Sequence, residues 1–208
     1  MSHRSKRPRR PGWGRLLRLA LPVLVGPLSI ADITGCRPPS VGEHLGSVVL
    51  PATDGRMHPL PPGDVGAPLT VLVFSAWHCP CQTAHDARLN ELYARYHARG
   101  VDFYAVDSEV NGSLADDAAQ AKVHRYAFPV LRDEGAGLAR ALRAEYATES
   151  FVIDRQGVVR YHGGLDTDRK SLHDDAVPLL GNAVDDLLQG RVSRAAETKA
   201  LGCALQTW

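Results

Sequence analysis

The chain has 208 residues, which is enough for one domain and a leader but too few for two large domains. Apolar residues make up 44% of it and charged residues 23%, a composition typical of soluble globular proteins. The formal charge of +1 conceals an asymmetry, because residues 1–35 hold seven Lys/Arg and one acid. Residues 36–208 therefore hold 17 basic and 22 acidic residues, a net charge of −5. Nucleic-acid binding by this larger part has no electrostatic support.

The first 35 residues have the pattern of an export signal. A basic segment, MSHRSKRPRRPGWGR, precedes the apolar run LALPVLVGPLSIA (19–31), which is too short and too interrupted by Pro and Gly for a membrane span. The following ITGC resembles the lipobox of bacterial lipoproteins, which implies cleavage before Cys36 and lipid on its sulfur. Asp32 departs from that pattern, and an uncleaved N-terminal anchor is the alternative. Both alternatives predict a protein on the extracytoplasmic side of a bacterial cell envelope.

Residues 36–46, rich in Pro, Gly and Ser, predict a short tether, and 47–208 predict one domain. The continuous apolar run LTVLVFSAW (69–77) is typical of a strand buried on both faces. Residues 80–99 then change to helical spacing, and Gly100 is placed to end that helix.

The rest of the domain continues this alternation of strand and helix. We expect a strand at 101–108, a helix at 113–127 capped by Ser113, a strand at 128–133, a short helix at 136–146, a hairpin at 150–163 that turns at Gly157, and a helix at 178–190. The order predicts an α/β fold with a central mixed sheet flanked by helices. It matches a thioredoxin-like domain with an inserted strand–helix unit.

The cysteine motif AWHCPCQTAH (76–85) lies where the first predicted strand ends and a helix begins. Unpaired N–H groups and the macrodipole at a helix N-terminus favour an anion, so a thiolate held there is nucleophilic at neutral pH. Pro80 suits the first helical position because it has no N–H to leave unpaired. We therefore expect Cys79 to be the N-cap residue and the nucleophile, with Cys81 in the first turn.

Four segments, in order, resemble the redoxin family, the thioredoxin-fold group of thiol–disulfide oxidoreductases and thiol-dependent antioxidant proteins. They are FSAWHCPCQTAHDARLNELYARYHARGVDFYAVDSE, FPVLRDEGAGLARAL, ATESFVIDRQGVVRYHGGLD and LLQGRVSRAAETKALGCAL. They look most similar to a branch that ends in a Gly-Cys motif, here Gly202–Cys203, and they cover about 44–205. The resemblance implies a thiol-dependent oxidoreductase without an organic cofactor, because the sulfur atoms carry the electrons.

Three features depart from the family pattern. The cysteines are spaced C-x-C rather than C-x-x-C, and Thr148 lies near the position of the thioredoxin cis-proline. Leu72 and Ala76 occupy the Pro and Thr/Ser positions of the peroxiredoxin motif P-x-x-x-[TS]-x-x-C. The groups that would bind and polarise a peroxide are therefore absent, although peroxidase activity remains an alternative.

In the expected reaction Cys79 attacks a substrate disulfide and either Cys81 or Cys203 resolves the mixed disulfide. A Cys79–Cys81 bond would close a small, strained and readily reduced ring. Cys203 is the other resolving candidate, or else an inert packed thiol. His78 either holds the thiolate as an ion pair or is an exposed loop residue.

Trp77 and Thr148 are candidate substrate contacts, and core packing is the alternative for Trp77. The implied partners are a protein or small-molecule disulfide or thiol, an extracytoplasmic electron donor and the membrane, through lipid on Cys36.

Two further functions compete with the oxidoreductase hypothesis. His85 lies four residues after Cys81 on the same helical face, so Cys79, Cys81 and His85 could bind Cu(I), which takes thiolate and imidazole ligands. The second alternative is a non-catalytic redoxin-fold module whose thiols are structural. A surface position is the third interpretation of His85.

Overall fold

The computed structural model describes residues 41–207. The predicted export signal, Cys36 and the first part of the predicted tether lie outside these residues. The strands are β1 (Val48–Pro51), β2 (Met57–Leu60), β3 (Leu69–Ser75), β4 (Asp102–Asp107), β5 (Val130–Arg132), β6 (Ser150–Asp154) and β7 (Val159–Gly163). The helices are α1 (Pro80–His97), α2 (Leu114–Val123), the 3₁₀ turn η1 (Glu134–Ala136), α3 (Gly137–Leu142) and α4 (Leu179–Leu188).

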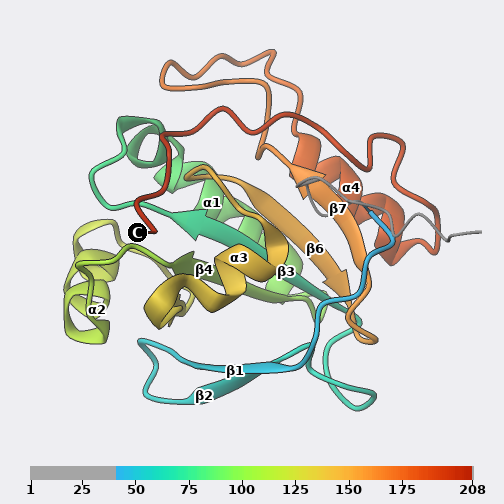
Figure 1. Cartoon of the computed structure of the whole chain (residues 1–208). Helices are drawn as coiled ribbons and strands as arrows, with labels where there is room; N and C mark the ends of the chain where they lie inside the picture. The colour runs from blue at the N-terminus through green and yellow to red at the C-terminus, as the bar shows by residue number, and fades with distance from the viewer. Residues whose placement is uncertain (1–40, 208) are drawn as a thin grey trace, which may run out of the picture. The chain divides into compact units, whose positions relative to one another are not determined.

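The central sheet has five strands in the order β5-β4-β3-β6-β7 (Figure 1). β3 pairs in parallel with β4, and β4 with β5, whereas β6 runs antiparallel to both β3 and β7. All seven residues of the central strand β3 are buried, as its continuous apolar run predicts. The predicted mixed α/β sheet of thioredoxin-like type is confirmed.

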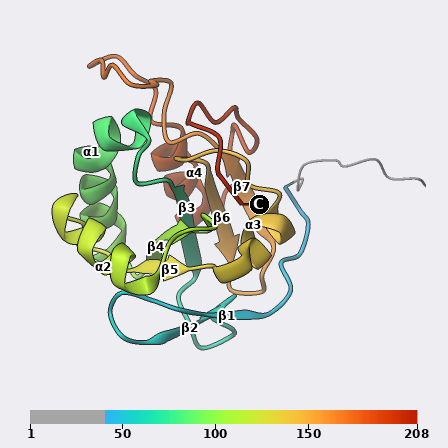
Figure 2. The same ribbon diagram turned by 60° about the vertical axis from the view of Figure 1, so that its left-hand side comes forward.

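Alternating side chains of β3 contribute to two hydrophobic layers. Val71 and Val73 pack in the layer that includes residues of α1, α2 and α4, whereas Leu72 and Phe74 pack in the layer that includes α3 and the β1–β2 hairpin. In Figure 2 α1 and α2 lie on one side of the sheet and α3 on the other. Each face of the sheet is therefore covered, which a thioredoxin-like fold requires.

Local signals in the sequence account for where several elements begin and end. Cys79 is the N-cap residue of α1 and Pro80 its first residue, as predicted. The hydroxyl oxygen of Ser113 accepts a hydrogen bond from the backbone N–H of Asp116 (3.2 Å), which caps α2. The turn between β6 and β7 contains Gly157 at a φ of +88°, a conformation that favours glycine.

Two parts of the fold differ from the sequence-based expectation. The hairpin of β1 and β2 was not predicted, because VVLP and MHPL are short and each contains a proline. The predicted helix at 136–146 is only α3, which ends where Arg143 adopts a left-handed conformation with a φ of +53°.

The part of the predicted tether that the structure describes, residues 41–46, packs on the domain. Leu45 is 4% exposed, and its N–H donates to the carbonyl of Gly157 (2.8 Å). The N–H of Gly42 donates to the carbonyl of Val159. Backbone hydrogen bonds of this kind hold residues 41–46 against β7 and the turn before it. No helix within residues 41–207 has the length and apolar character needed to cross a membrane.

Candidate active site

Three cysteine sulfurs meet at the N-terminus of α1. Cys79 forms a disulfide with Cys203, which lies 124 residues later in the chain, with their Cα atoms 5.8 Å apart. Cys81 is a free thiol, and the sulfurs of all three cysteines lie within 4.8 Å of one another. Cys79 and Cys81 are 1% and 4% exposed, whereas Cys203 is partly exposed. Of the two resolving candidates, the structure pairs Cys203 with Cys79.

Steric constraints explain why a glycine precedes Cys203. A Cβ atom on Gly202 would lie 1.6 Å from the carbonyl oxygen of Ala147, so only glycine permits this approach of the two backbones. The approach is fixed by hydrogen bonds from the N–H of Ala147 to the carbonyl of Cys203 (2.8 Å) and from the N–H of Leu205 to the carbonyl of Glu145 (2.9 Å). Gly202 thus allows the C-terminal segment to carry Cys203 to Cys79.

The N-terminus of α1 favours negative charge on Cys79. The backbone of Cys79 is extended (φ −86°, ψ +113°), no side chain caps the helix, and the first turn contains no acidic residue. The unpaired N–H groups of this turn and the helix macrodipole stabilise an anion at the N-cap position. A thiolate released when the disulfide is reduced therefore lies in a favourable field.

A cleft of about 410 Å³ is lined by residues close in sequence to the two bonded cysteines. Its lining includes Trp77 and His78, which precede Cys79, and Gln206, which follows Cys203. Glu109 and Asp116 also line it, and burial, followed by the nearby Asp107 carboxylate, raises the pKa of Glu109. The cleft is therefore lined with polar and acidic groups and could receive a substrate next to the sulfurs.

Beneath the cleft, Trp77 joins two buried carboxyl groups. Its indole N–H donates to Asp107 (3.1 Å) and to Asp117 (2.9 Å), and Arg132 forms an ion pair with Asp107 (3.1 Å). We call Trp77, Asp107, Asp117 and Arg132 the Trp77 cluster. Burial and the neighbouring Asp107 carboxylate raise the pKa of Asp117 to about 8, so Asp117 keeps its proton at neutral pH.

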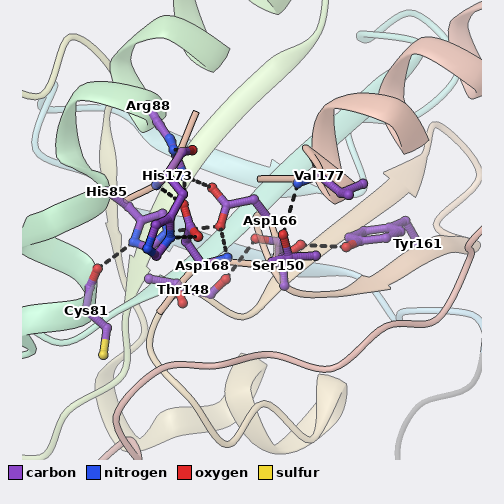
Figure 3. A network of polar contacts seen from close by, with 12 residues as sticks. Cys81, His85, Arg88, Thr148, Ser150, Tyr161, Asp166, Asp168, His173 and Val177 are labelled. Carbon is purple, nitrogen blue, oxygen red and sulfur yellow. Dashed lines mark hydrogen bonds and ion pairs between the residues drawn. The ribbon is translucent and has the colours of Figure 1, made fainter. Parts of the chain in front are cut away.

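On the opposite side of the cysteine motif, His85 is held between two acceptors (Figure 3). Its Nδ1 bonds the carbonyl oxygen of Cys81 (2.6 Å) and its Nε2 bonds a carboxylate oxygen of Asp166 (3.1 Å). Neither partner can donate a hydrogen bond, so both ring nitrogens must carry protons. Burial alone would lower the pKa of His85, but the hydrogen bonds to Asp166 and to the Cys81 carbonyl, together with the Asp166 charge, outweigh burial and the pKa is raised.

Arg88 extends this arrangement into the loop after β7. It donates to Asp166 (2.6 Å) and to Asp168 (2.8 Å), and His173 also pairs with Asp168 (2.7 Å). We call His85, Arg88, Asp166 and Asp168 the His85 cluster. Its ion pairs tie the 164–173 loop to the first turns of α1.

The predicted site residues separate into those near the sulfurs and those engaged elsewhere. Figure 3 shows the Cys81 sulfur pointing away from His85, whose ring nitrogens are both occupied. The alternative metal site of Cys79, Cys81 and His85 is therefore not assembled. Thr148 is buried, and its N–H donates to the carbonyl of Phe74 (2.7 Å).

Trp77 and His78 occupy positions that suit their predicted roles only in part. Trp77 is 9% exposed, so it both packs in the core and lines the cleft. His78 is exposed, and within residues 41–207 the structure gives it no hydrogen bond to Cys79. The two carboxyl groups below Trp77 were missed, because an Asp at the end of a strand and another in a helix form no local motif.

Comparison with known proteins identifies the family. Residues 41–162 match the model of the AhpC/TSA family. An uncharacterized conserved protein from Geobacillus kaustophilus is 26% identical, with a TM-score of 0.73 over 82% of this chain and 93% of that one. A hypothetical protein from Sinorhizobium meliloti 1021 is 25% identical, with a TM-score of 0.71 over 81% and 94%.

More distant structures show the same fold. A thiol:disulfide interchange protein, DsbE, from Chlorobium tepidum is 20% identical, with a TM-score of 0.55 over 73% of this chain and 96% of that one. No curated protein matches the chain. The matched residues include β3, the cysteine motif and β6, and they support thiol-dependent redox chemistry at the sulfur site. The chain belongs to the AhpC/TSA family.

Proposed function

We propose that this protein is an exported thiol–disulfide oxidoreductase in which Cys79 is the nucleophile and Cys203 resolves the mixed disulfide. The observation that carries the proposal is the Cys79–Cys203 disulfide at the N-terminus of α1, beside an open cleft. A disulfide that joins a helix N-terminus to a partly exposed cysteine can accept two electrons by thiol exchange, and the dithiol that results can donate them to a substrate.

Reduction of the substrate requires the dithiol form of the protein. The Cys79 thiolate attacks one sulfur of a substrate disulfide, forms a mixed disulfide, and expels the other substrate sulfur as a thiolate that takes a proton from solvent. Cys203, after losing its proton, attacks the Cys79 sulfur and expels the second substrate thiolate. Two electrons thereby pass from the protein to the substrate, and the Cys79–Cys203 bond forms again.

Regeneration of the dithiol begins at Cys203, because Cys79 is 1% exposed whereas Cys203 is partly exposed. Attack of a donor thiolate on the Cys203 sulfur expels Cys79 as a thiolate at the helix N-terminus, where it is stabilised. A stabilised thiolate is the better leaving group in thiol–disulfide exchange. A second donor thiol then releases Cys203, so the donor must be a dithiol or two thiols.

The N-terminal sequence supports an extension of the proposal to the location of the protein. We extend the proposal to cleavage of residues 1–35, lipid attachment at Cys36 and an extracytoplasmic position at the membrane. The supporting features are the basic segment, the short apolar run and the small residues before Cys36. An electron donor on the same side of the membrane is then required, such as a membrane-bound dithiol protein.

The proposal is tested by following thiol release from a disulfide-bonded peptide with the reduced full chain carrying Cys36→Ser. Cys79→Ser should lower turnover by at least about 1,000-fold. Cys203→Ser should stop after one mixed disulfide on Cys79, identified by mass spectrometry, whereas Cys81→Ser is the matched control and should turn over. Full turnover by Cys203→Ser would remove Cys203 from the mechanism.

A peroxide assay on the same proteins separates exchange from peroxidase activity. Leu72 and Ala76 are buried and carry no hydroxyl group that could polarise a peroxide. We therefore expect hydrogen peroxide to oxidise Cys79 more slowly than the peptide disulfide does. Faster oxidation by peroxide would replace the exchange function with a peroxidase.

A further inference from the structure

The third sulfur, that of Cys81, has no role in the exchange reaction described above. It is a buried free thiol, yet its sulfur lies within 4.8 Å of the sulfurs of both Cys79 and Cys203. The three residues come from the N-terminus of α1 and from a segment more than 120 residues later, since Cys79 and Cys203 are separated by 124 positions. This convergence forms a three-sulfur donor set.

The spacing of the sulfurs suits a metal ion once the disulfide is reduced. Metal–sulfur bonds of about 2.3 Å place the three sulfurs of a trigonal site about 4 Å apart. In the disulfide form the three sulfur atoms lie within 4.8 Å of one another, which is close to that value. Reduction breaks the bond between Cys79 and Cys203, and the two sulfurs then separate to non-bonded contact, which opens the triangle toward the size that an ion requires.

The donor set selects the kind of ion. Thiolates are soft ligands that favour Cu(I), whereas Zn²⁺ in structural sites takes four ligands in a tetrahedron. Within residues 41–207, no fourth Cys, His, Asp or Glu joins the three cysteines. His85, the nearest candidate by sequence, uses one ring nitrogen for the Cys81 carbonyl and the other for Asp166. Three soft ligands without a fourth match Cu(I).

The surroundings of the sulfurs favour bound, charged thiolates. Cys79 lies at the positive end of the α1 macrodipole, with no acidic side chain in the first turn. The ring of His85 bonds the Cys81 carbonyl oxygen (2.6 Å) and holds the first turns of the helix in place. Cys79 and Cys81 are shielded from water, and the partly exposed Cys203 leaves a route of entry.

We propose that the reduced protein binds one Cu(I) ion through the thiolates of Cys79, Cys81 and Cys203. A dithiol reductant supplies two electrons and two protons to the Cys79–Cys203 bond and is itself oxidised to a disulfide. Each cysteine then loses its proton to solvent as it binds the ion, and copper remains Cu(I) throughout. The proposal does not require the exchange activity, but it predicts that bound Cu(I) blocks that activity by occupying the nucleophile.

The test uses the full chain carrying Cys36→Ser, so that these three cysteines are the only thiols. The protein is reduced with dithiothreitol, freed of reductant without oxygen, and titrated with Cu(I) in competition with bicinchoninate. We expect one equivalent to bind, with near-ultraviolet sulfur-to-copper absorption, and X-ray absorption to show three sulfur neighbours. The disulfide form should bind none. Nitrogen in the copper shell, or preferential binding of Zn²⁺ with four ligands, would overturn the proposal.

Variants assign the ligands. Cys81→Ser and Cys203→Ser should each lower Cu(I) affinity by more than about 100-fold, which exceeds the usual cost of losing an outer-shell partner. His85→Gln is the matched control, and it should retain one equivalent and three sulfur neighbours. Unchanged affinity in Cys81→Ser would exclude a three-sulfur site. Copper binding is measured by the titration and by X-ray absorption, so its outcome is independent of the exchange assay.

Discussion

The Trp77 cluster and the His85 cluster each combine buried aspartates with an arginine and an aromatic ring next to the cysteine motif. The pKa of an aspartate is nevertheless raised in the first cluster and lowered in the second. In the Trp77 cluster, Arg132 forms an ion pair with Asp107, and the pKa of the neighbouring Asp117 is raised to about 8. In the His85 cluster, the pKa of Asp166 is lowered, although burial alone would raise it. Burial is common to both, so the difference comes from the partners.

The hydrogen-bond donors around each carboxyl group decide the direction. Asp166 accepts hydrogen bonds from His85, from the backbone N–H of Asp168 and from Arg88, and these together with the His85 charge outweigh the cost of burying its charge. Asp117 has only the indole N–H of Trp77 and faces another carboxylate. The Trp77 cluster therefore holds a protonated carboxyl group, whereas the His85 cluster holds an ionised one. Trp77 and His85 are the members of the two clusters that belong to the cysteine motif.

The largest expected effect comes from removing a charge from the His85 cluster. Asp166→Asn removes the carboxylate that pairs with both His85 and Arg88. The free energy of unfolding should therefore fall by about 3 kcal/mol. The change is measured by urea denaturation at pH 6. Asp117→Asn, the same chemical change in the other cluster, is the matched control and should cost much less at that pH. Equal losses would remove the distinction between the clusters.

The next largest effect on stability is expected from replacing the charged ring of His85. The raised pKa of His85 means that its contribution to stability is complete below its ordinary pKa of 6.5 and is lost as the pH rises through the folded-state value. His85→Gln should therefore cost about 2 kcal/mol at pH 6, in the range of hydrogen bonds to charged groups. The difference from the wild type should shrink toward pH 9. A difference that is constant with pH would mean that His85 is neutral in the fold.

Asp117→Asn should also gain stability relative to the wild type as the pH rises. Between the ordinary carboxyl pKa of 3.8 and about 8, the folded protein holds a proton on Asp117 that the unfolded chain releases, so stability falls as the pH rises. Asparagine removes this dependence and can still accept the Trp77 hydrogen bond. The Tm of the variant should therefore rise relative to the wild type between pH 5 and pH 9, by about 2–4 °C for each kcal/mol. A relative fall would contradict a protonated Asp117.

The smallest effect is expected at the exposed edge of the His85 cluster. His173 pairs with Asp168, but its side chain is 62% exposed, and solvent screens such pairs. His173→Gln should leave Tm unchanged within error at pH 6, as measured by thermal unfolding beside His85→Gln. A loss as large as that of His85→Gln would show that the whole loop depends on this pair.

Much of the fold and the first half of the sulfur site could be predicted, because their signals are local. The apolar run of β3, Pro80 at the first position of α1, Ser113 before α2 and Gly157 in the hairpin each act within a few residues. The N-cap position of Cys79 follows from the same kind of signal. The β1–β2 hairpin has no such signal, since proline interrupts both short strands.

The sequence by itself determined the order of the elements from β3 to α4 and the place of Cys79, because periodicity, capping and turn chemistry depend on neighbours along the chain. Only the tertiary structure decided that Cys203 pairs with Cys79, since that contact spans 124 residues and depends on the approach of Gly202 to Ala147. The same holds for His85 with Asp166, 81 residues apart. Such contacts are set by where the folded backbone brings distant segments together, which no local pattern encodes.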